Sequence, residues 1–203
     1  MKKIVIKNLF LVIIIGFMSG CQKEIYMDQG GSNVHKEIIE ARRWYETNHQ
    51  GNIFFKIKSR GGSSIEIKPD WEHAYVRSNK REKTVETELF MKGGINFALP
   101  ENKQKFEETH DERYAWSHIR LVVKTNLGNG AKDAFLMSII PSVEYLELTD
   151  FKAFDNNNYI VRDKQFTGRI LYHNLEGEFV NGWVYQNGKI THSLKRVQQD
   201  ETR

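Results

Sequence analysis

Histidines, carboxylates and one thiol are the side chains of this 203-residue chain that could carry out chemistry. The seven histidines are scattered singly, without a HExxH or paired-cysteine pattern, and this spacing predicts no metal site. Asp70-Trp71-Glu72-His73 is the closest approach to an acid–base pair, but in a strand Glu72 and His73 would point to opposite faces. The sequence has no GxSxG elbow and no Walker-type glycine motif. We therefore predict no catalytic residue and no cofactor, while an exported hydrolase with dispersed active residues stays open.

The four tryptophans could instead stack on sugar rings. Trp44 lies beside an expected helix stripe and Trp116 lies in the most apolar segment, so core packing accounts for both. Trp71 closely follows Pro69 and Trp183 adjoins an expected turn, so these two are the pair expected at the surface. We therefore take Trp71 and Trp183 as candidate ligand-binding residues.

Residues 1–20 have the three-part layout of a secretory signal, with a basic start, an apolar stretch from Leu9 to Phe17 and a small-residue exit. The apolar stretch is shorter than the roughly 20 residues that span a bilayer. Cys21 is the only cysteine, so no intramolecular disulfide can form. Met18-Ser19-Gly20-Cys21 resembles the lipobox of bacterial lipoproteins. The resemblance implies cleavage between Gly20 and Cys21, and fatty chains such as palmitate on the residue Cys21.

Segments after Cys21 bear on where in the cell the protein is located. Gln22-Lys23-Glu24 is similar to the lysine-plus-acid export signal of surface lipoproteins in the Bacteroidota, with one acid before Ile25. The Trp71–Ala74 and Phe166–Ile190 regions are similar to those of uncharacterised lipoproteins of the same group. The resemblance implies an outer-membrane lipoprotein exposed on the cell surface. Without the export signal, a position facing the periplasm would be expected.

Removal of the leader changes the charge of the chain. The whole chain has 30 Lys and Arg against 26 Asp and Glu, a net charge of +4. Residues 1–20 contain three lysines and no acid, so the remainder carries 27 minus 26, or +1. Without clustered cations to neutralise phosphates, there is no electrostatic case for nucleic-acid binding. The expected partners are a membrane, through lipid on Cys21, and a protein or glycan at the cell surface.

One helix and a run of strands must position these residues. Val34, Ile38, Ala41 and Tyr45 recur at spacings of four, three and four, which predicts an amphipathic helix over about 32–48. The later segments are aromatic and β-branched with a period near two, which predicts strands. The expected strands are 53–58, 64–68, 74–77, 84–90, 95–99, 114–125, 135–140, 159–162, 168–172, 178–180, 183–185 and 189–192. We expect 114–125 and 135–140 to pair in the middle of an antiparallel sheet.

Turn residues separate these strands. Asn181-Gly182 and Asn187-Gly188 predict two-residue hairpins, because both can adopt positive backbone angles. The tract at 155–158 predicts a turn. Residues 101–113 are almost all polar, which predicts a solvated excursion or a short exposed helix.

The pattern predicts an α+β fold, with one N-terminal amphipathic helix packed on a mainly antiparallel, meander-rich β-sheet. We expect residues 1–20 to be a signal, 21–31 a flexible tether, 32–196 a single domain and 197–203 a disordered tail.

The function that this pattern favours is a non-enzymatic binding or assembly component of the cell envelope, held by lipid on Cys21. An exported hydrolase and an inhibitor of an extracellular enzyme stay open as alternatives. A pocket with two or more converging carboxylates or histidines would favour the hydrolase. A flat face with an exposed Trp71 or Trp183 would favour binding, and a long ordered loop projecting from 99–114 would favour inhibition.

Overall fold

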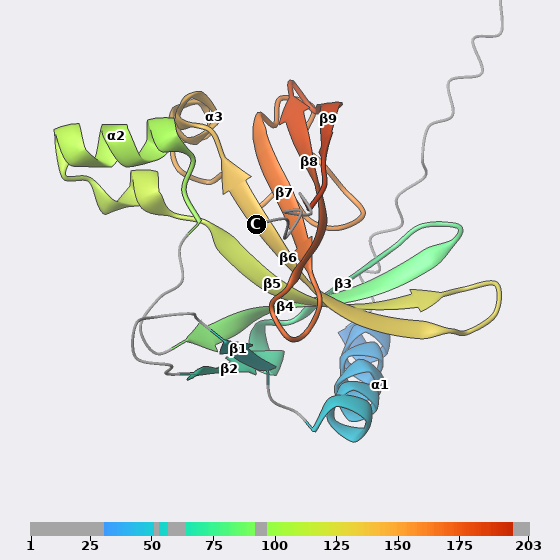
Figure 1. Cartoon of the computed structure of the whole chain (residues 1–203). Helices are drawn as coiled ribbons and strands as arrows, with labels where there is room; N and C mark the ends of the chain where they lie inside the picture. Colours follow the sequence, from blue (N-terminus) through green and yellow to red (C-terminus); the bar gives the residue numbers. More distant parts are fainter. Residues whose placement is uncertain (1–30, 51–52, 57–63, 92–96, 197–203) are drawn as a thin grey trace, which may run out of the picture.

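The computed structural model describes residues 31–50, 53–56, 64–91 and 97–196. The expected signal, the cleavage and lipidation site at Gly20 and Cys21, almost all of the expected tether and the expected tail lie outside these residues. Figure 1 shows a helix beside one end of a long, twisted sheet and a group of shorter helices near the other end. Within the described ranges, no helix combines the length and apolar character needed to cross a membrane.

The N-terminal helix α1 (Gly31–His49) is the helix that the apolar stripe predicts. Ala41 and Tyr45 are buried against the sheet, and Val34 and Ile38 pack beside them. Packing of this apolar face stabilises the helix more than the intrinsic preferences of its residues do. The prediction of an amphipathic helix on a sheet is confirmed.

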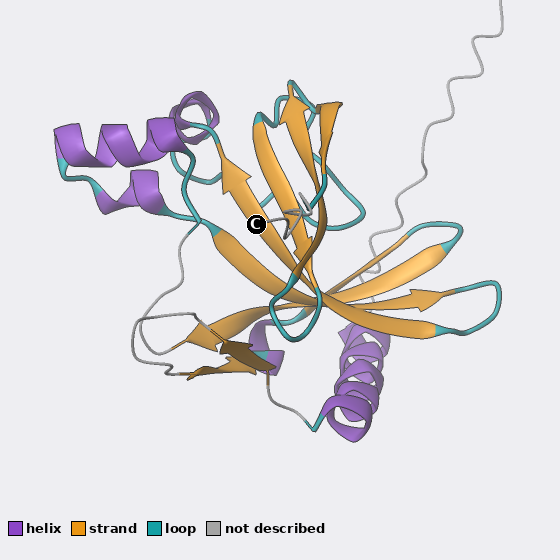
Figure 2. Ribbon diagram, in the orientation of Figure 1, coloured by secondary structure: helices purple, strands orange, loops and turns teal. Residues whose placement is uncertain are grey.

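Nine strands form one antiparallel sheet within the described residues. They are β1 (Ile53–Lys56), β2 (Ser64–Pro69), β3 (Tyr75–Ser78), β4 (Glu82–Met91), β5 (His118–Asn126), β6 (Lys132–Pro141), β7 (Gly168–His173), β8 (Phe179–Gln186) and β9 (Lys189–Leu194). Their order is β1-β2-β4-β5-β6-β7-β8-β9, with β3 also paired to β4. Strands β4 to β9 follow one another in the chain and in the sheet, so the predicted meander is confirmed (Figure 2).

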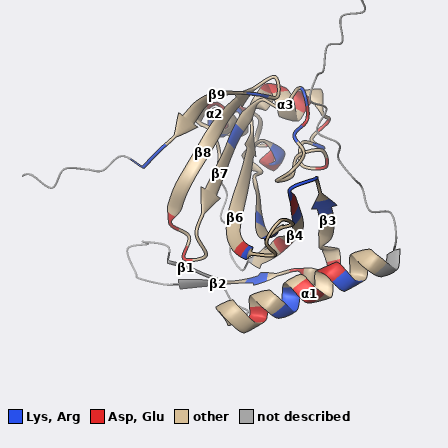
Figure 3. Cartoon of the chain, turned by 90° about the vertical axis from the view of Figure 1, so that its right-hand side faces the viewer, with Lys and Arg blue, Asp and Glu red and all other residues tan. Residues whose placement is uncertain are grey.

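The sheet has a hydrophobic core on each face. Leu121 and Val123 belong to the core under α1, which lies along one face in Figure 3. Val122, between them, belongs to the second core, because side chains alternate along a strand. The helix α3 (Val143–Leu148) contributes to this second core through Tyr145 and Leu146. The sequence prediction missed α3, a six-residue helix whose first turn is capped by the Ser142 hydroxyl.

The polar region at 101–113 is helical. The helix α2 (Pro100–Thr109) has proline in its first turn and ends at His110, whose φ is 56°. A 3-10 turn, η2 (Glu112–Ala115), follows it. Most residues of α2 are partly or fully exposed and only Asn102 is buried, so the expectation of a short exposed helix is confirmed.

One of the two predicted Asn-Gly hairpins is wrong. Asn181-Gly182 lies inside β8, which replaces the two separate strands expected there. A Cβ at Gly182 would lie 2.8 Å from the Ile170 carbonyl oxygen, so glycine is needed here for a close approach within the sheet. Asn187-Gly188 does form the turn between β8 and β9, with φ of 48° and 69°.

Residues 159–162 do not form the predicted strand. They belong to the irregular 149–167 segment between α3 and β7. The Asn158 side chain accepts hydrogen bonds from the N–H groups of Ile160 and Val161 at 3.1 and 2.7 Å. Such local bonds hold the backbone away from a strand ladder. The tract 155–158 forms the expected turn at its start, and Asn157 and Asn158 after it are buried.

Three further expectations are corrected by the structure. Trp71-Glu72-His73 is a 3-10 turn, η1 (Trp71–His73), and not part of a strand. Trp116 is 42% exposed, because β5 begins two residues later and the side chain falls outside its buried segment. Residues 97–99 lie in no strand, and the remainder of the strand expected at 95–99 lies outside the described residues.

Candidate ligand-binding pocket

A cavity of about 510 Å³ lies where β5 to β8 meet the 149–167 segment. Its volume falls within the range of roughly 300–1,000 Å³ typical of small-ligand sites. The lining combines aromatic rings, amides, one lysine and one aspartate. The lining residues are Lys124, Asp133, Ala134, Phe135, Tyr159, Tyr172, His173, Asn174, Val180, Asn181 and Trp183.

Three aromatic side chains form one wall of the pocket. Phe135 lies 5.3 Å from Tyr159 and 5.8 Å from Tyr172 between ring centroids, and the two tyrosine rings are 6.1 Å apart. The Tyr172 ring meets both of its neighbours edge-on, a favourable arrangement of aromatic quadrupoles. Burial raises the pKa of Tyr159 and of Tyr172. A tyrosine hydroxyl is protonated at neutral pH even without this shift, so both phenols can donate a hydrogen bond.

Strand β8 adds a fourth ring and an amide. Asn181 and Trp183 are two residues apart, so they project from the same face of the strand. Asn181 lies opposite Tyr172 in the register, and Trp183 lies opposite Ile170. Trp183 is half-buried, which leaves part of its indole available to a ligand. The interior glycine, Gly182, thus falls between two pocket residues.

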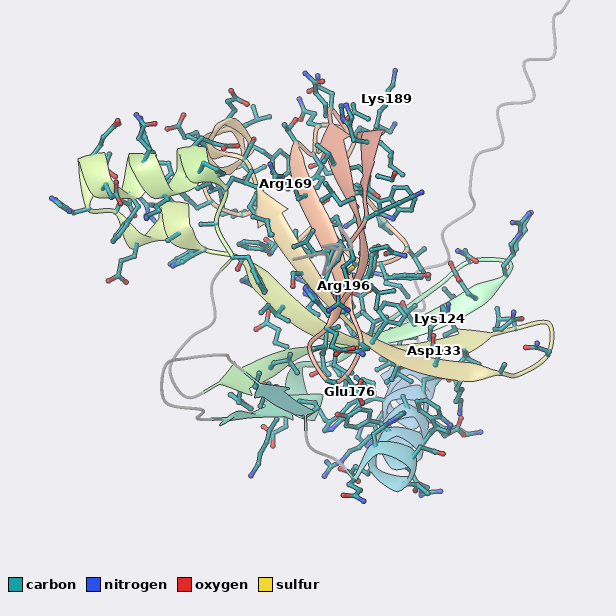
Figure 4. All side chains as sticks on the ribbon, viewed as in Figure 1. Lys124, Asp133, Arg169, Glu176, Lys189 and Arg196 are labelled. Carbon is teal, nitrogen blue, oxygen red and sulfur yellow. The ribbon has the colours of Figure 1, made fainter. Side chains whose placement is uncertain are left out.

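Two opposite charges face each other across the β5–β6 pair. Lys124 and Asp133 are register partners, and both line the pocket (Figure 4). The Lys124 ammonium lies 5.8 Å from the Phe135 centroid and 5.9 Å from the Tyr159 centroid. The electron-rich ring faces attract this cation.

His173 lies in the pocket wall. Only 5% of the residue is exposed, its ring stacks on Phe97 at 5.6 Å, and Phe179 meets it edge-on. Burial lowers the pKa of His173, so the imidazole is neutral at pH 7. Its Nδ1 has no hydrogen-bond partner among the residues that the structure describes. The packing of this ring keeps it from acting as a freely accessible base.

A buried ionic network holds Tyr159 in place. Glu86 is fully buried; its Oε1 accepts a hydrogen bond from the Tyr159 N–H at 2.8 Å, and its Oε2 accepts one from the Tyr75 hydroxyl at 2.9 Å. Arg120 lies 3.7 Å from the same carboxylate. Burial raises the pKa of Glu86, whereas Arg120 and these hydrogen bonds oppose the rise.

Arg120 connects the sheet to the 149–167 segment. Its guanidinium donates to the carbonyl oxygens of Asn157 at 2.7 Å and Phe154 at 3.1 Å. The Asn157 amide donates in turn to the Tyr145 hydroxyl and to the Ala153 carbonyl oxygen. The irregular segment that carries Tyr159 is therefore fixed by buried hydrogen bonds instead of a strand ladder.

The two tryptophans predicted to bind a ligand lie in different places. Trp183 lines the pocket, whereas Trp71 packs beside the core under α1, 5.8 Å from the Tyr45 ring. Near Trp71, the Asp70 carboxylate lies 2.6 Å from His73 Nδ1, and this hydrogen bond raises the pKa of His73. Asp70 also caps η1 by accepting from the Glu72 N–H. The structure thus assigns Asp70 a local structural role.

Most pocket residues were not identified from the sequence. The sequence predicts that the two central strands pair. The length of the loop between them sets the register of such a pair, and this register could have placed Lys124 opposite Asp133. Arg120, inside the most apolar segment, was a visible sign of a buried charge. The position of Tyr159 carried no such sign, because it depends on contacts with Glu86, 73 residues away in the chain.

The described residues contain no group of three or more His, Cys, Asp or Glu side chains that could hold a metal ion. Comparisons of the chain with protein-family models, curated proteins and solved structures found no match.

Proposed function

We propose that this protein is a lipid-anchored component of the bacterial cell envelope whose domain binds a glycan in the aromatic pocket. The observation that carries the proposal is the lining of this pocket, in which Trp183 and the wall formed by Phe135, Tyr159 and Tyr172 stand beside two amides. Sugar rings have apolar C–H faces that pack on aromatic rings and hydroxyl groups that need hydrogen-bond partners. The pocket offers both kinds of surface.

The proposed anchor comes from the leader. The basic start, the apolar stretch and the small residues before Cys21 support export and lipidation. Several acyl chains on one residue would hold the protein firmly, because each buried methylene contributes about 0.8 kcal/mol. The similarity of Gln22-Lys23-Glu24 to a surface export signal supports a position on the outer membrane that faces outward.

Binding is better supported than the two alternatives. A hydrolase would use converging carboxylates or histidines, but among the described lining residues Asp133 is the one carboxylate and His173 is packed between rings. An inhibitor would present a long ordered loop, whereas residues 100–109 form α2. Trp183 is partly exposed in a pocket and not on the flat face that was expected, and a ligand in this pocket can reach its indole.

A glycan array tests the proposed ligand class. Labelled full-length protein in detergent should bind a subset of glycans, and Trp183→Ala should weaken this binding at least about tenfold, because aromatic anchors dominate small interfaces. Trp116→Ala, which removes an exposed indole outside the pocket, is the matched control and should bind like the wild type. Equal binding by wild type and Trp183→Ala would reject the pocket, and no glycan binding would reject the ligand class.

Metabolic labelling tests the anchor separately. Cells that express the protein should incorporate radiolabelled palmitate into it, and Cys21→Ala should abolish the label and leave an uncleaved precursor. A wild-type protein without label would contradict lipidation. Protease added to intact cells should degrade the protein; complete protection would place it away from the surface.

A further inference from the structure

Lys124 gives the pocket a cation that the protein itself leaves available. Its ammonium rests over the rings of Phe135 and Tyr159, at 5.8 and 5.9 Å from their centroids, and forms no ion pair with a described residue. An ammonium has three N–H donors, and ring faces do not replace strong oxygen acceptors for all of them. An oxygen-bearing ligand can therefore bind here without breaking an existing salt bridge.

Asp133 shows what else this ligand needs. The carboxylate is opposite Lys124 in the register and lines the same pocket, so the two charges are presented together. An ionised carboxylate only accepts hydrogen bonds, which suits sugar hydroxyls as donors. A ligand with an anionic group for Lys124 and hydroxyls for Asp133 would satisfy both.

We propose that the ligand is an acidic sugar, whose carboxylate pairs with the Lys124 ammonium while its ring stacks on the aromatic lining and its hydroxyls bind Asp133 and Asn181. This inference rests on the proposed glycan-binding function and adds the chemical class of the glycan. Lys124 is the specificity-determining residue, because a neutral sugar would offer it only hydroxyl oxygens. Charge-assisted hydrogen bonds are roughly twice as strong as neutral ones, which favours the acidic sugar.

Calorimetric titration of the full-length protein in detergent tests this assignment with chemically matched probes. The probes are oligomers of galacturonic acid, oligomers of glucuronic acid and a sialylated oligosaccharide, each compared with its methyl ester. Esterification removes the charge and keeps the ring and hydroxyls. At least one acid should bind about 10- to 100-fold more tightly than its ester. The preference should fall as salt is raised from 0.05 to 0.5 M, because ions screen the pairing.

Variants of the charged pair identify the residue responsible. Lys124→Met should lose the preference for the acid and keep the affinity for the ester, whereas Lys124→Arg should retain the preference. Asp133→Asn should keep the preference for the acid, because the acid and its ester offer the same hydroxyls to residue 133. Lys132→Met is the matched control, because Lys132 lies next to Asp133 in β6 and outside the lining, and it should behave like the wild type.

The outcomes separate this inference from the proposed function. Binding of esters as tight as acids, or an equal loss of both in Lys124→Met, would overturn the acidic ligand and leave glycan binding intact. If no acid or ester binds and the protein also binds no glycan on the array, both the acidic ligand and the proposed glycan binding are overturned.

Discussion

Glu86 is a fully buried carboxylate that connects the sheet to the pocket wall. It accepts hydrogen bonds from the Tyr159 N–H and the Tyr75 hydroxyl and lies beside Arg120. A buried charge is tolerated only when it is paired and hydrogen-bonded, and these contacts supply both requirements. The removal of Glu86 would leave the Arg120 cation buried without its counter-charge.

We predict that Glu86→Ala lowers the free energy of unfolding by about 3–5 kcal/mol, the usual cost of breaking a buried ion pair. Urea denaturation followed by circular dichroism measures the change. Glu176→Ala, which truncates an exposed glutamate in the β7–β8 turn, should change stability by less than about 0.5 kcal/mol. Similar effects of the two substitutions would show that the network does not hold the segment.

His173 should make stability depend on pH. Burial lowers the pKa of this residue in the folded protein, so the unfolded chain binds a proton first as the pH falls below about 6.5. Proton binding then favours the unfolded state. As the pH falls, the free energy of unfolding therefore decreases, by at most about 1.4 kcal/mol per pH unit for this one group.

We predict that His173→Phe removes this part of the pH dependence while keeping the stack on Phe97. As the pH is lowered from 7.5 to 5.5, the unfolding free energy of the wild type should fall more than that of the variant. His192→Phe, at an exposed position of β9, should show no such change. A constant difference for His173→Phe across this range would mean that His173 titrates alike in both states.

The helix α2 is an element with little apolar surface that is held in place by an amide. Asn102 is 1% exposed, and its side-chain N–H groups donate to the carbonyl oxygens of Tyr114 at 3.0 Å and Pro141 at 3.1 Å. These bonds connect α2 to η2 and to the end of β6. The polar character of 101–113 shows why the helix is exposed, and Asn102 shows why it is ordered.

We predict that Asn102→Ala lowers the unfolding free energy by about 1–3 kcal/mol, because two buried carbonyl groups lose their donors. Compared with the wild type, the variant should show faster amide hydrogen exchange in α2 and little change in β5. Lys103→Ala, at the next and exposed position, should leave both quantities near their wild-type values. Unchanged exchange in α2 of Asn102→Ala would show that other contacts hold the helix.

Elements with regular periodicity were predictable from the sequence, and elements held by particular side chains were not. The stripe of α1, the β5–β6 pair and the Asn187-Gly188 turn follow from local patterns that depend on a few residues. Asn181-Gly182 has the same local pattern but lies inside β8, where the glycine serves close packing because Ile170 and Leu171 leave no room for a Cβ. Tyr159-Ile160-Val161 has strand-forming residues, but Asn158 binds its backbone N–H groups instead.

The candidate site was predictable only in part. Trp183, which the sequence predicts to be a ligand-binding residue at the surface, lines the pocket. Phe135 and Tyr172 were expected in strands, but their meeting with Tyr159 depends on the buried network that crosses from β4 and β5 to the 149–167 segment. The pattern of neighbouring residues in a single sequence does not show which distant residues will make such contacts.

At the scale of the whole molecule, the two faces of the sheet are covered by different elements. The helix α1 covers one face of the sheet (Figure 1). The pocket lies where β5 to β8 meet the 149–167 segment. In the proposed arrangement, lipid on Cys21 carries the attachment and the folded domain remains free to bind. The pocket therefore has to account for recognition by itself.

Tryptophan fluorescence during ligand titration tests the location of binding most directly. The probe is the glycan that binds most tightly on the array, added to wild type and to Trp183→Phe. In the wild type, the emission should change and saturate with the calorimetric binding curve, because the ligand covers the Trp183 indole. In Trp183→Phe, which keeps Trp44, Trp71 and Trp116, this change should be absent even at glycan concentrations that calorimetry shows to be saturating. An equal emission change in both proteins, or none in the wild type at saturation, would contradict binding in this pocket.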